Sequence, residues 1–209
     1  TYIMLIVGAT ALITLNIHSM FPSMIKAFRY AIFQVVTVIT TTGYATTDFN
    51  TWPEISRTIL LLLMFIGACA GSTGGGIKVS RILILCKTVR KELHIFLHPN
   101  AVKKIKMDGK AIPHEVVRST NIFFIVYVLI FASSIFLIAF DDFDLITNFT
   151  AVAATFNNIG PGLELVGPTG NFGMFSWFSK LILTFDMLAG RLEIFPLLIL
   201  FVRDTWKKF

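Results

Sequence analysis

Charged residues are scarce in this sequence of 209 residues. Only 14% are Asp, Glu, Lys or Arg, whereas 55% are apolar, and the aromatic residues are mostly Phe. Because soluble domains carry about 25% charged residues, this composition excludes an ordinary soluble protein and indicates a membrane protein. Cysteine is scarce too. Cys69 and Cys86 belong to no spaced metal or redox motif, so we expect no disulfide framework and interpret both as packing residues.

Sequence motifs of enzymes are also missing. The sequence has no phosphate-binding glycine loop, no dinucleotide-binding fingerprint and no nucleophile elbow. A membrane-embedded enzyme would need clustered His, Asp or Glu at membrane depth, and only Asp186, Arg191 and Glu193 qualify as polar groups there. We therefore expect no covalent chemistry and no cofactor in this chain.

Long apolar runs dominate the sequence instead. Residues 121–140 carry no charge over a length that just spans a hydrocarbon core of roughly 30 Å at about 1.5 Å per helical residue. We predict a transmembrane helix over residues 116–140 and a hydrophobic helix over residues 1–15, and residues 58–77 are likewise uncharged. The first helix lacks a basic leader and a small-residue cleavage site, so we do not expect it to be a signal peptide.

Charge of each sign is concentrated in particular connections. A basic patch can bind nucleic acid, but between membrane spans the positive-inside rule explains it better and places residues 87–113 and the C-terminal tail in the cytoplasm, with no nucleic-acid partner. The basic residues are Lys78, Arg81, Lys87, Arg90, Lys91, Lys103, Lys104, Lys106 and Lys110, with Arg203, Lys207 and Lys208 in the tail. The opposite connections carry acids that form either a cation-attracting outer vestibule or ordinary solvated loops: Asp48, Glu54, Asp141, Asp142, Asp144 and Glu164.

Two parts of the sequence repeat one order of segments when Gly43 is laid over Gly160. Each part has a spanning helix, a short apolar segment (residues 24–39 and 144–156), a polar stretch with glycine, and a long apolar helix. Because the short segments have only roughly 13 to 16 residues, they are too brief to cross a bilayer and are predicted to be re-entrant pore helices. The predicted fold is an all-α membrane protein with two tandem helix, pore helix, filter, helix repeats.

The polar stretches after the pore helices are the candidate binding site. Non-helical backbone at membrane depth must pack in protein or line an aqueous path. A ring of backbone carbonyls can replace the hydration shell of K⁺, and glycine permits the φ values that bring successive carbonyls to one axis. We predict a potassium-binding filter whose walls are Thr41, Thr42 and Gly43 in the first repeat and Asn158, Ile159 and Gly160 in the second.

Two features predict a gate below this filter. Glycines interrupt the long helix of the first repeat at Gly67, Gly71, Gly74, Gly75 and Gly76. Each costs a helix interior roughly 1 kcal/mol relative to alanine, which favours a movable loop over close helix packing through small residues. Arg191 lies inside an apolar span, where a charge generally faces a cavity or a partner. Its alternative role is a salt bridge with Glu193 or Asp186 that joins helices.

Five motifs together resemble the Trk/Ktr/HKT superfamily of potassium transporters, in particular the pore-forming subunit of the Trk type. They are TTTGY, GACAGSTGGGIKV, RKELHIFLHPNAV followed by GKAIP, FNNIGPG and MLAGRLEIFP. The resemblance implies that K⁺, the transported ion, is coordinated by Thr41, Thr42, Asn158 and Ile159. It also implies an intramembrane glycine loop that obstructs the pore and an arginine, matching Arg191, that narrows it.

The resemblance further implies a larger assembly. Members have four repeats around a pseudo-fourfold pore, and this sequence matches the third and fourth, so we expect it to be the C-terminal half of a longer chain. The implied partners are the two missing repeats, a second copy in a homodimer, and a cytoplasmic nucleotide-binding regulatory ring of the NAD or ATP type. The implied location is the inner cell membrane.

We divide the chain into a first membrane repeat (residues 1–92), a basic cytoplasmic connection (93–113) and a second membrane repeat with a short cytoplasmic tail (114–209). The predicted function is potassium uptake through the filter. The alternatives are a secondary cation carrier (K⁺/Na⁺ or K⁺/H⁺ symport) whose broken helices form an alternating-access site, and a membrane scaffold or enzyme. The sequence leaves the choice between K⁺ and Na⁺ open.

Overall fold

The computed structural model describes residues 1–67, 69, 71–72, 74–99, 104–107, 109–192 and 194–199. The first repeat contains α1 (Tyr2–Ile17), α2 (Met24–Ile39), α3 (Glu54–Phe65) and α4 (Val79–Leu97), and the second contains α5 (His114–Ile138), α6 (Leu145–Phe156), α7 (Trp177–Arg191) and α8 (Ile194–Ile199). Short 3₁₀ turns lie at His18–Met20, Phe49–Thr51, Ala139–Asp141, Glu164–Val166 and Phe172–Met174. The predicted all-α class is confirmed.

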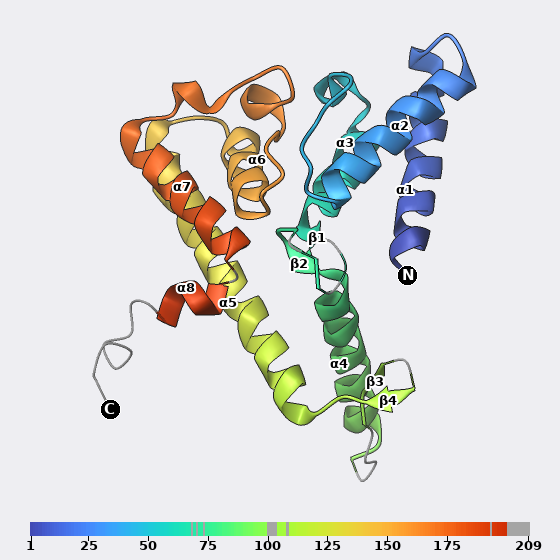
Figure 1. Cartoon of the computed structure of the whole chain (residues 1–209), viewed down its shortest axis with the longest axis vertical. Coiled ribbons are helices and arrows are strands. Elements are labelled where there is room, and N and C mark those ends of the chain that lie inside the picture. The colour runs from blue at the N-terminus through green and yellow to red at the C-terminus, as the bar shows by residue number, and fades with distance from the viewer. Residues whose placement is uncertain are drawn as a thin grey trace.

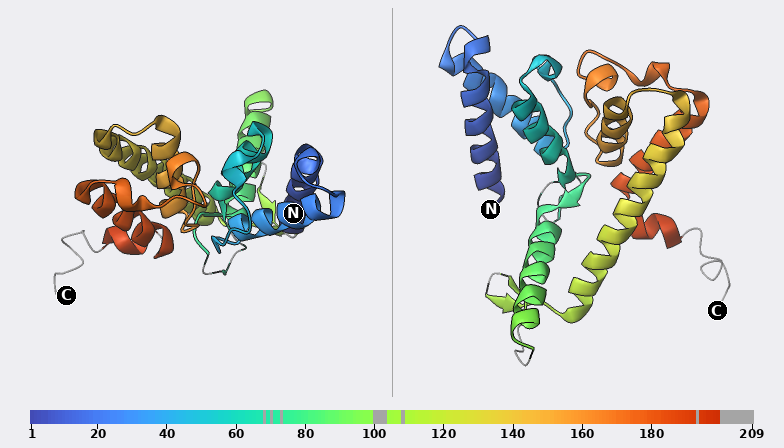
Figure 2. Two further views of the ribbon diagram at one scale, coloured as in Figure 1. Left: turned by 90° about the horizontal axis from the view of Figure 1, so that it is seen from above. Right: turned by 180° about the vertical axis from the view of Figure 1, so that it is seen from behind.

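The helices form two groups that lie side by side (Figures 1 and 2). One group packs α1, α2 and α3 around a core that includes Ile13, Val35 and Met64. The other packs α5, α6 and α7 around a core that includes Ile138 and Phe156. The groups meet where α3 contacts α6. In each group, all three helices contact one another.

Both short helices begin and end close to the predicted residues. Ser23 caps α2 by accepting a hydrogen bond from the Lys26 N–H at 3.3 Å, and Asp144 caps α6 by accepting one from the Thr147 N–H at 2.9 Å. Such caps satisfy backbone donors that have no partner within the helix. The helices predicted over residues 24–39 and 144–156 are confirmed.

Among the described residues, two helical segments are long and apolar enough to cross a membrane: Tyr2–Met20 and His114–Asp141. The uncharged run 58–77 is not one helix. α3 has 12 residues, which is about 18 Å of helix, and ends at Phe65. The strands β1 (Ile66–Gly67) and β2 (Ile77–Lys78) then pair in parallel, and α4 begins at Val79. Figure 2, seen from behind, shows α3 and α4 in one column with the strands between them.

The predicted connection also differs from the structure. α4 continues to Leu97, past the expected boundary at residue 92, and β3 (Lys106–Met107) and β4 (Lys110–Ala111) form an antiparallel hairpin that the sequence analysis did not predict. Gly109 has φ +80°, which suits the tight turn between the strands. Lys103 and the tail residues lie outside the described part of the chain. Cys69 and Cys86 are exposed, so their interpretation as packing residues was wrong.

The second long helix is interrupted as well, which corrects the expectation that Arg191 lies inside a continuous span. α7 ends at Arg191, Leu192 caps it, and α8 leaves in a different direction (Figure 1). Pro196 explains the interruption, because a proline inside a helix removes a donor and clashes with the carbonyl four residues earlier. It is tolerated in the first turn of α8, where no donor is needed.

Candidate functional site

Both pore helices end in a Schellman motif. In the first repeat the N–H groups of Thr41, Thr42 and Gly43 donate to the carbonyls of Val38, Thr37 and Thr37, at 3.0, 2.9 and 3.3 Å. In the second, those of Asn158, Ile159 and Gly160 donate to Thr155, Ala154 and Ala154, at 3.0, 2.8 and 3.4 Å. With Gly43 laid over Gly160, every donor and acceptor coincides. The two polar stretches therefore have one backbone architecture with different side chains.

The same motif puts a residue of each stretch into the left-handed region of backbone conformation. Thr41 has φ +54° and Asn158 has φ +55°, and the glycines that follow have φ +82° and +107°. Asparagine adopts this conformation with little strain, whereas a β-branched threonine is an outlier there. Residues held in such conformations concentrate at functional sites, so Thr41 marks the first polar stretch as a site held in place by its surroundings.

The carbonyl groups of these stretches have no hydrogen-bond donor among the described residues. The N–H groups point back into the helix ends, and within the described part of the chain the carbonyl oxygens of Thr41, Thr42, Asn158 and Ile159 accept no hydrogen bond. Oxygens that lack a donor within the protein are left to bind water or an ion. The arrangement supplies oxygen ligands of the kind that replace a cation's hydration shell.

The two stretches contact each other directly. A Cβ built on Gly43 would lie 1.9 Å from the carbonyl oxygen of Ile159, so only glycine fits at this position. Nothing lies within 4 Å of the corresponding position on Gly160. Cavities of about 460 and 490 Å³ adjoin the stretches, the first at Thr40, Thr42 and Tyr44 and the second at Asn158, Ile159 and Gly160.

The glycine segment lies against both stretches. The Gly75 N–H donates to the Thr41 hydroxyl at 3.3 Å, and a Cβ built on Gly75 would lie 2.2 Å from the carbonyl oxygen of Asn157. Gly76 has φ +74° and approaches the Asn157 carboxamide. Close backbone approach therefore explains the glycines at these two positions.

Arg191 shares a small cavity with this segment. The cavity, of about 90 Å³, is lined by Gly74, Gly76 and Arg191 together with Lys78, Arg81 and Tyr127. Gly71 is not among its lining residues; it lines a separate cavity beside α4 and α5, and a Cβ there would meet nothing within 4 Å. The structure thus brings Arg191 together with Gly74 and Gly76 but not with Gly71.

Of the two salt bridges suggested for Arg191, the structure describes both partners only for the one with Asp186. Asp186 is fully buried, and its Oδ1 accepts a hydrogen bond from the Ser134 hydroxyl at 2.7 Å. Its Oδ2 has no partner among the described residues, so a salt bridge from Asp186 to Arg191 is not found. Glu193 lies outside the described residues.

A polar contact that was not predicted lies behind the second stretch. The Tyr127 hydroxyl on α5 donates to the Asn157 Oδ1 at 2.8 Å, and the Asn157 Nδ2 donates to the Ala153 carbonyl at 2.8 Å. Asn157 is fully buried and Tyr127 stacks near Phe131 and Phe156. A single tyrosine within the Phe- and Ile-rich run 121–140 was the available signal.

Most of the acids expected in an outer vestibule have structural roles. Glu54 and Glu164 pair with Arg57, and Asp141 accepts a hydrogen bond from the Ser176 N–H at 2.8 Å. Hydrogen bonds from the Thr147 hydroxyl and N–H hold the pKa of the capping residue Asp144 below its usual range. These contacts favour the loop interpretation for the acids taken singly.

Two short helices that end in matching left-handed turns lie beside helices long enough to cross a membrane, which is the arrangement of a membrane protein built from two similar units. The chain belongs to the TrkH family: the family model described as "TrkH: Cation transport protein" matches residues 3–208. This family consists of transporters, not enzymes, and the membrane location predicted from composition is confirmed.

Curated relatives agree with the family. The chain is 42% identical over 191 residues to the Trk system potassium uptake protein TrkH of Salmonella typhimurium, and this match covers 91% of the chain. It is 44% identical over 190 residues to the TrkH protein of Vibrio parahaemolyticus, and 36% identical over 181 residues to the Trk system potassium uptake protein TrkG of Escherichia coli. The chain spans 39% of the length of the Salmonella relative.

A solved structure has the same fold. The crystal structure of the potassium transporter TrkH from Vibrio parahaemolyticus superimposes with a TM-score of 0.87 at 41% sequence identity. The match covers 99% of this chain and 44% of that one. The arrangement of helices described above is therefore that of a known transporter, and the predicted superfamily resemblance is confirmed.

Proposed function

We propose that this chain forms half of a potassium-conducting pore, in which the carbonyls of Thr41, Thr42, Asn158 and Ile159 coordinate K⁺. The observation that carries the proposal is the matched pair of Schellman motifs. Each consumes the N–H groups of its polar stretch and leaves the carbonyl oxygens without a donor among the described residues. The names of the relatives, which are potassium uptake proteins, support the choice of ion.

The mechanism follows from this geometry. K⁺ leaves its hydration shell and enters a ring of carbonyl oxygens, to which Gly43 and Gly160 contribute the backbone conformation. The C-terminal ends of α2 and α6, which carry the negative end of the helix dipole, lie at the same place and favour a cation there. Two further repeats complete the ring.

A gate below the filter completes the proposal. Gly71, Gly74, Gly75 and Gly76 belong to a loop that obstructs the pore, and Arg191 adds a positive charge that opposes cation leakage. The contact of Gly75 with Thr41 and the cavity shared by Gly74, Gly76 and Arg191 support this role.

The assembly is part of the same proposal. The chain acts within a longer protein of four repeats, in a homodimer in the inner membrane, with the basic connection facing a cytoplasmic nucleotide-binding ring. Two observations support this assembly. The chain spans only 39% of the length of its Salmonella relative, and its relatives are named as parts of a Trk system.

Transport assays on the full-length protein in proteoliposomes test the proposal. Gly43→Ser should abolish the preference for K⁺ over Na⁺ or the flux itself, and unchanged selectivity and flux would refute the filter. Arg191→Ala and deletion of residues 72–76 should each raise K⁺ flux, and no increase would refute the gate. A current that follows the electrochemical gradient supports the pore, whereas slow saturable flux supports the alternative carrier.

A further inference from the structure

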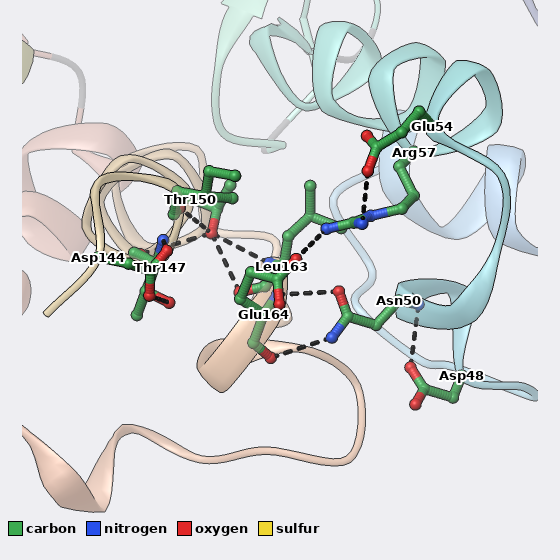
Figure 3. Close-up of polar contacts among 10 residues, drawn as sticks. Asp48, Asn50, Glu54, Arg57, Asp144, Thr147, Thr150, Leu163 and Glu164 are labelled. Atoms are coloured by element: carbon green, nitrogen blue, oxygen red, sulfur yellow. Dashed lines mark hydrogen bonds and ion pairs between the residues drawn. The ribbon is translucent and has the colours of Figure 1, made fainter.

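An ion pair joins the two repeats on the side where the pore helices begin. Arg57, on α3, donates through Nη1 to Glu54 of the same helix at 2.9 Å and through Nη2 to Glu164 of the second repeat. The Arg57 side chain is only 12% exposed, compared with 39% for Glu164 and 81% for Glu54. Figure 3 shows the guanidinium lying between the two carboxylates. The bond across the repeats is therefore the better shielded of the two.

A side-chain amide joins the repeats at the same residue. The Asn50 Oδ1 accepts a hydrogen bond from the Glu164 N–H at 2.9 Å, and the Asn50 Nδ2 donates to the Glu164 carbonyl at 3.3 Å (Figure 3). Asp48 fixes Asn50 in turn by accepting its N–H at 3.0 Å. Glu164 has φ +53°, a conformation that a glutamate keeps only when its surroundings impose it. Both its backbone and its side chain are thus held by the first repeat.

The residue before Glu164 is anchored on the second pore helix. The Leu163 N–H donates to the Thr150 hydroxyl at 3.0 Å, and this hydroxyl donates to the Ile146 carbonyl of α6 at 2.8 Å. Contacts of two consecutive residues, Leu163 and Glu164, therefore connect α6 to α3. Asn50 follows the first filter stretch along the chain, and Glu164 follows the second. The contacts tie together the two segments that leave the filter.

We propose that Asn50, Arg57 and Glu164 form an inter-repeat clamp that fixes the spacing of the two filter stretches and so determines ion selectivity without touching the ion. This inference rests on the proposed function, because it assumes that the stretches coordinate K⁺. Selectivity depends on where the carbonyls are held, whether through cavity size or through the field of the carbonyl dipoles. Gly43 already touches the Ile159 carbonyl, so a small relative movement of the repeats changes the filter itself.

The test compares Glu164→Gln with Glu54→Gln in the full-length protein. Both remove one carboxylate charge from Arg57, but only the first removes the ion pair between repeats, while the backbone contacts of residue 164 with Asn50 remain. Reversal potentials of the reconstituted protein in K⁺ and Na⁺ gradients give the permeability ratio. We expect Glu164→Gln and Asn50→Ala to lower the K⁺ over Na⁺ ratio by about fivefold or more, a factor that corresponds to about 1 kcal/mol, and Glu54→Gln to leave it near wild type.

A charge exchange separates positioning from folding. In a Glu54→Gln background, which removes repulsion, Arg57→Glu should lower the ratio and Arg57→Glu with Glu164→Arg should restore most of it. Restored selectivity supports the clamp even if a single variant folds poorly. The clamp is refuted if the conducting variants at Asn50 and Glu164 keep the wild-type ratio, or if the exchange restores protein yield but not selectivity. A wild-type protein without K⁺ selectivity would instead refute the proposed function.

Discussion

The two repeats end their pore helices in the same way and then diverge. TTTG and NNIG share no side chain before the glycine, yet they make the same hydrogen bonds to the preceding helix. The long helices that follow differ: α3 stops at a glycine loop, whereas α7 runs to Arg191. The stretch that would coordinate an ion is thus specified by backbone geometry and tolerates different side chains. The segment that would gate the pore differs between the repeats.

The repeats also differ in how much room surrounds Gly43 and Gly160, the glycines of the two polar stretches. Gly43 faces the Ile159 carbonyl, and Gly160 faces open space in this chain. Equivalent positions in a pseudosymmetric site are therefore not equally sensitive to substitution.

The largest expected effect comes from Gly43→Ala. The added Cβ would lie 1.9 Å from a backbone oxygen at φ +82°, so the two stretches must separate. We expect K⁺ flux in proteoliposomes to fall by about tenfold or more, the factor for about 1.4 kcal/mol. Gly160→Ala, strained only in its backbone at φ +107°, should lose less. Equal losses would show that steric contact between the stretches does not distinguish the repeats.

Gly190→Ala should destabilise the second repeat by roughly 1–3 kcal/mol, the usual cost of overpacking. A Cβ there would lie 1.8 Å from the Phe156 carbonyl oxygen, where α7 crosses the end of α6. Thermal unfolding in detergent measures the effect. Gly8→Ala in α1 is the matched control, because nothing lies within 4 Å of its Cβ position and alanine favours a helix. A similar loss of stability in both variants would contradict the crossing argument.

Tyr127→Phe should cost about 1–3 kcal/mol of stability, because it leaves the buried Asn157 Oδ1 without its donor while the ring contacts remain. Denaturant unfolding of the reconstituted or detergent-solubilised protein measures this. Tyr30→Phe serves as the control in the first repeat, since the Tyr30 ring stacks on Phe21 and its hydroxyl has no hydrogen bond among the described residues. If Tyr30→Phe costs as much, the Asn157 contact is not responsible.

The smallest effect concerns the cap of α6. The pKa of Asp144 is lowered in the folded state, so its contribution to stability is present above the unfolded value of about 3.9 and is lost as the pH falls through the lower folded value. Asp144→Ala should cost roughly 0.5–2 kcal/mol at neutral pH. Asp144→Asn should keep most of the cap but flatten the loss of stability below about pH 4. An unchanged acid profile in Asp144→Asn would assign that profile to other groups.

Much of the fold could be predicted because its signals are local. Apolar runs predicted α1 and α5, and the short apolar segments that recur in both repeats predicted α2 and α6. The glycine positions gave the end of α3, because glycine disfavours a helix whatever surrounds it. The end of α7 was missed although Pro196 signals it, since Arg191 was read within one apolar span.

The candidate site was predictable only in part. The repeat located both polar stretches after the short helices, but the left-handed conformation of Thr41 depends on surroundings that no local pattern encodes. The contacts of Tyr127 with Asn157 and of Arg57 with Glu164 join residues far apart in the sequence. Glu164 was read as one of several loop acids, because a single sequence does not show which carboxylate meets an arginine from another repeat.

Ion density in a structure of the full-length protein tests the central claim most directly. Crystals or particles prepared with Rb⁺, which scatters more strongly than K⁺, should show density on the axis beside the carbonyl oxygens of Thr41, Thr42, Asn158 and Ile159. Those oxygens should point toward the density. Rb⁺ bound elsewhere in the pore, with these carbonyls turned away from it, would contradict the assignment of the two stretches as the filter.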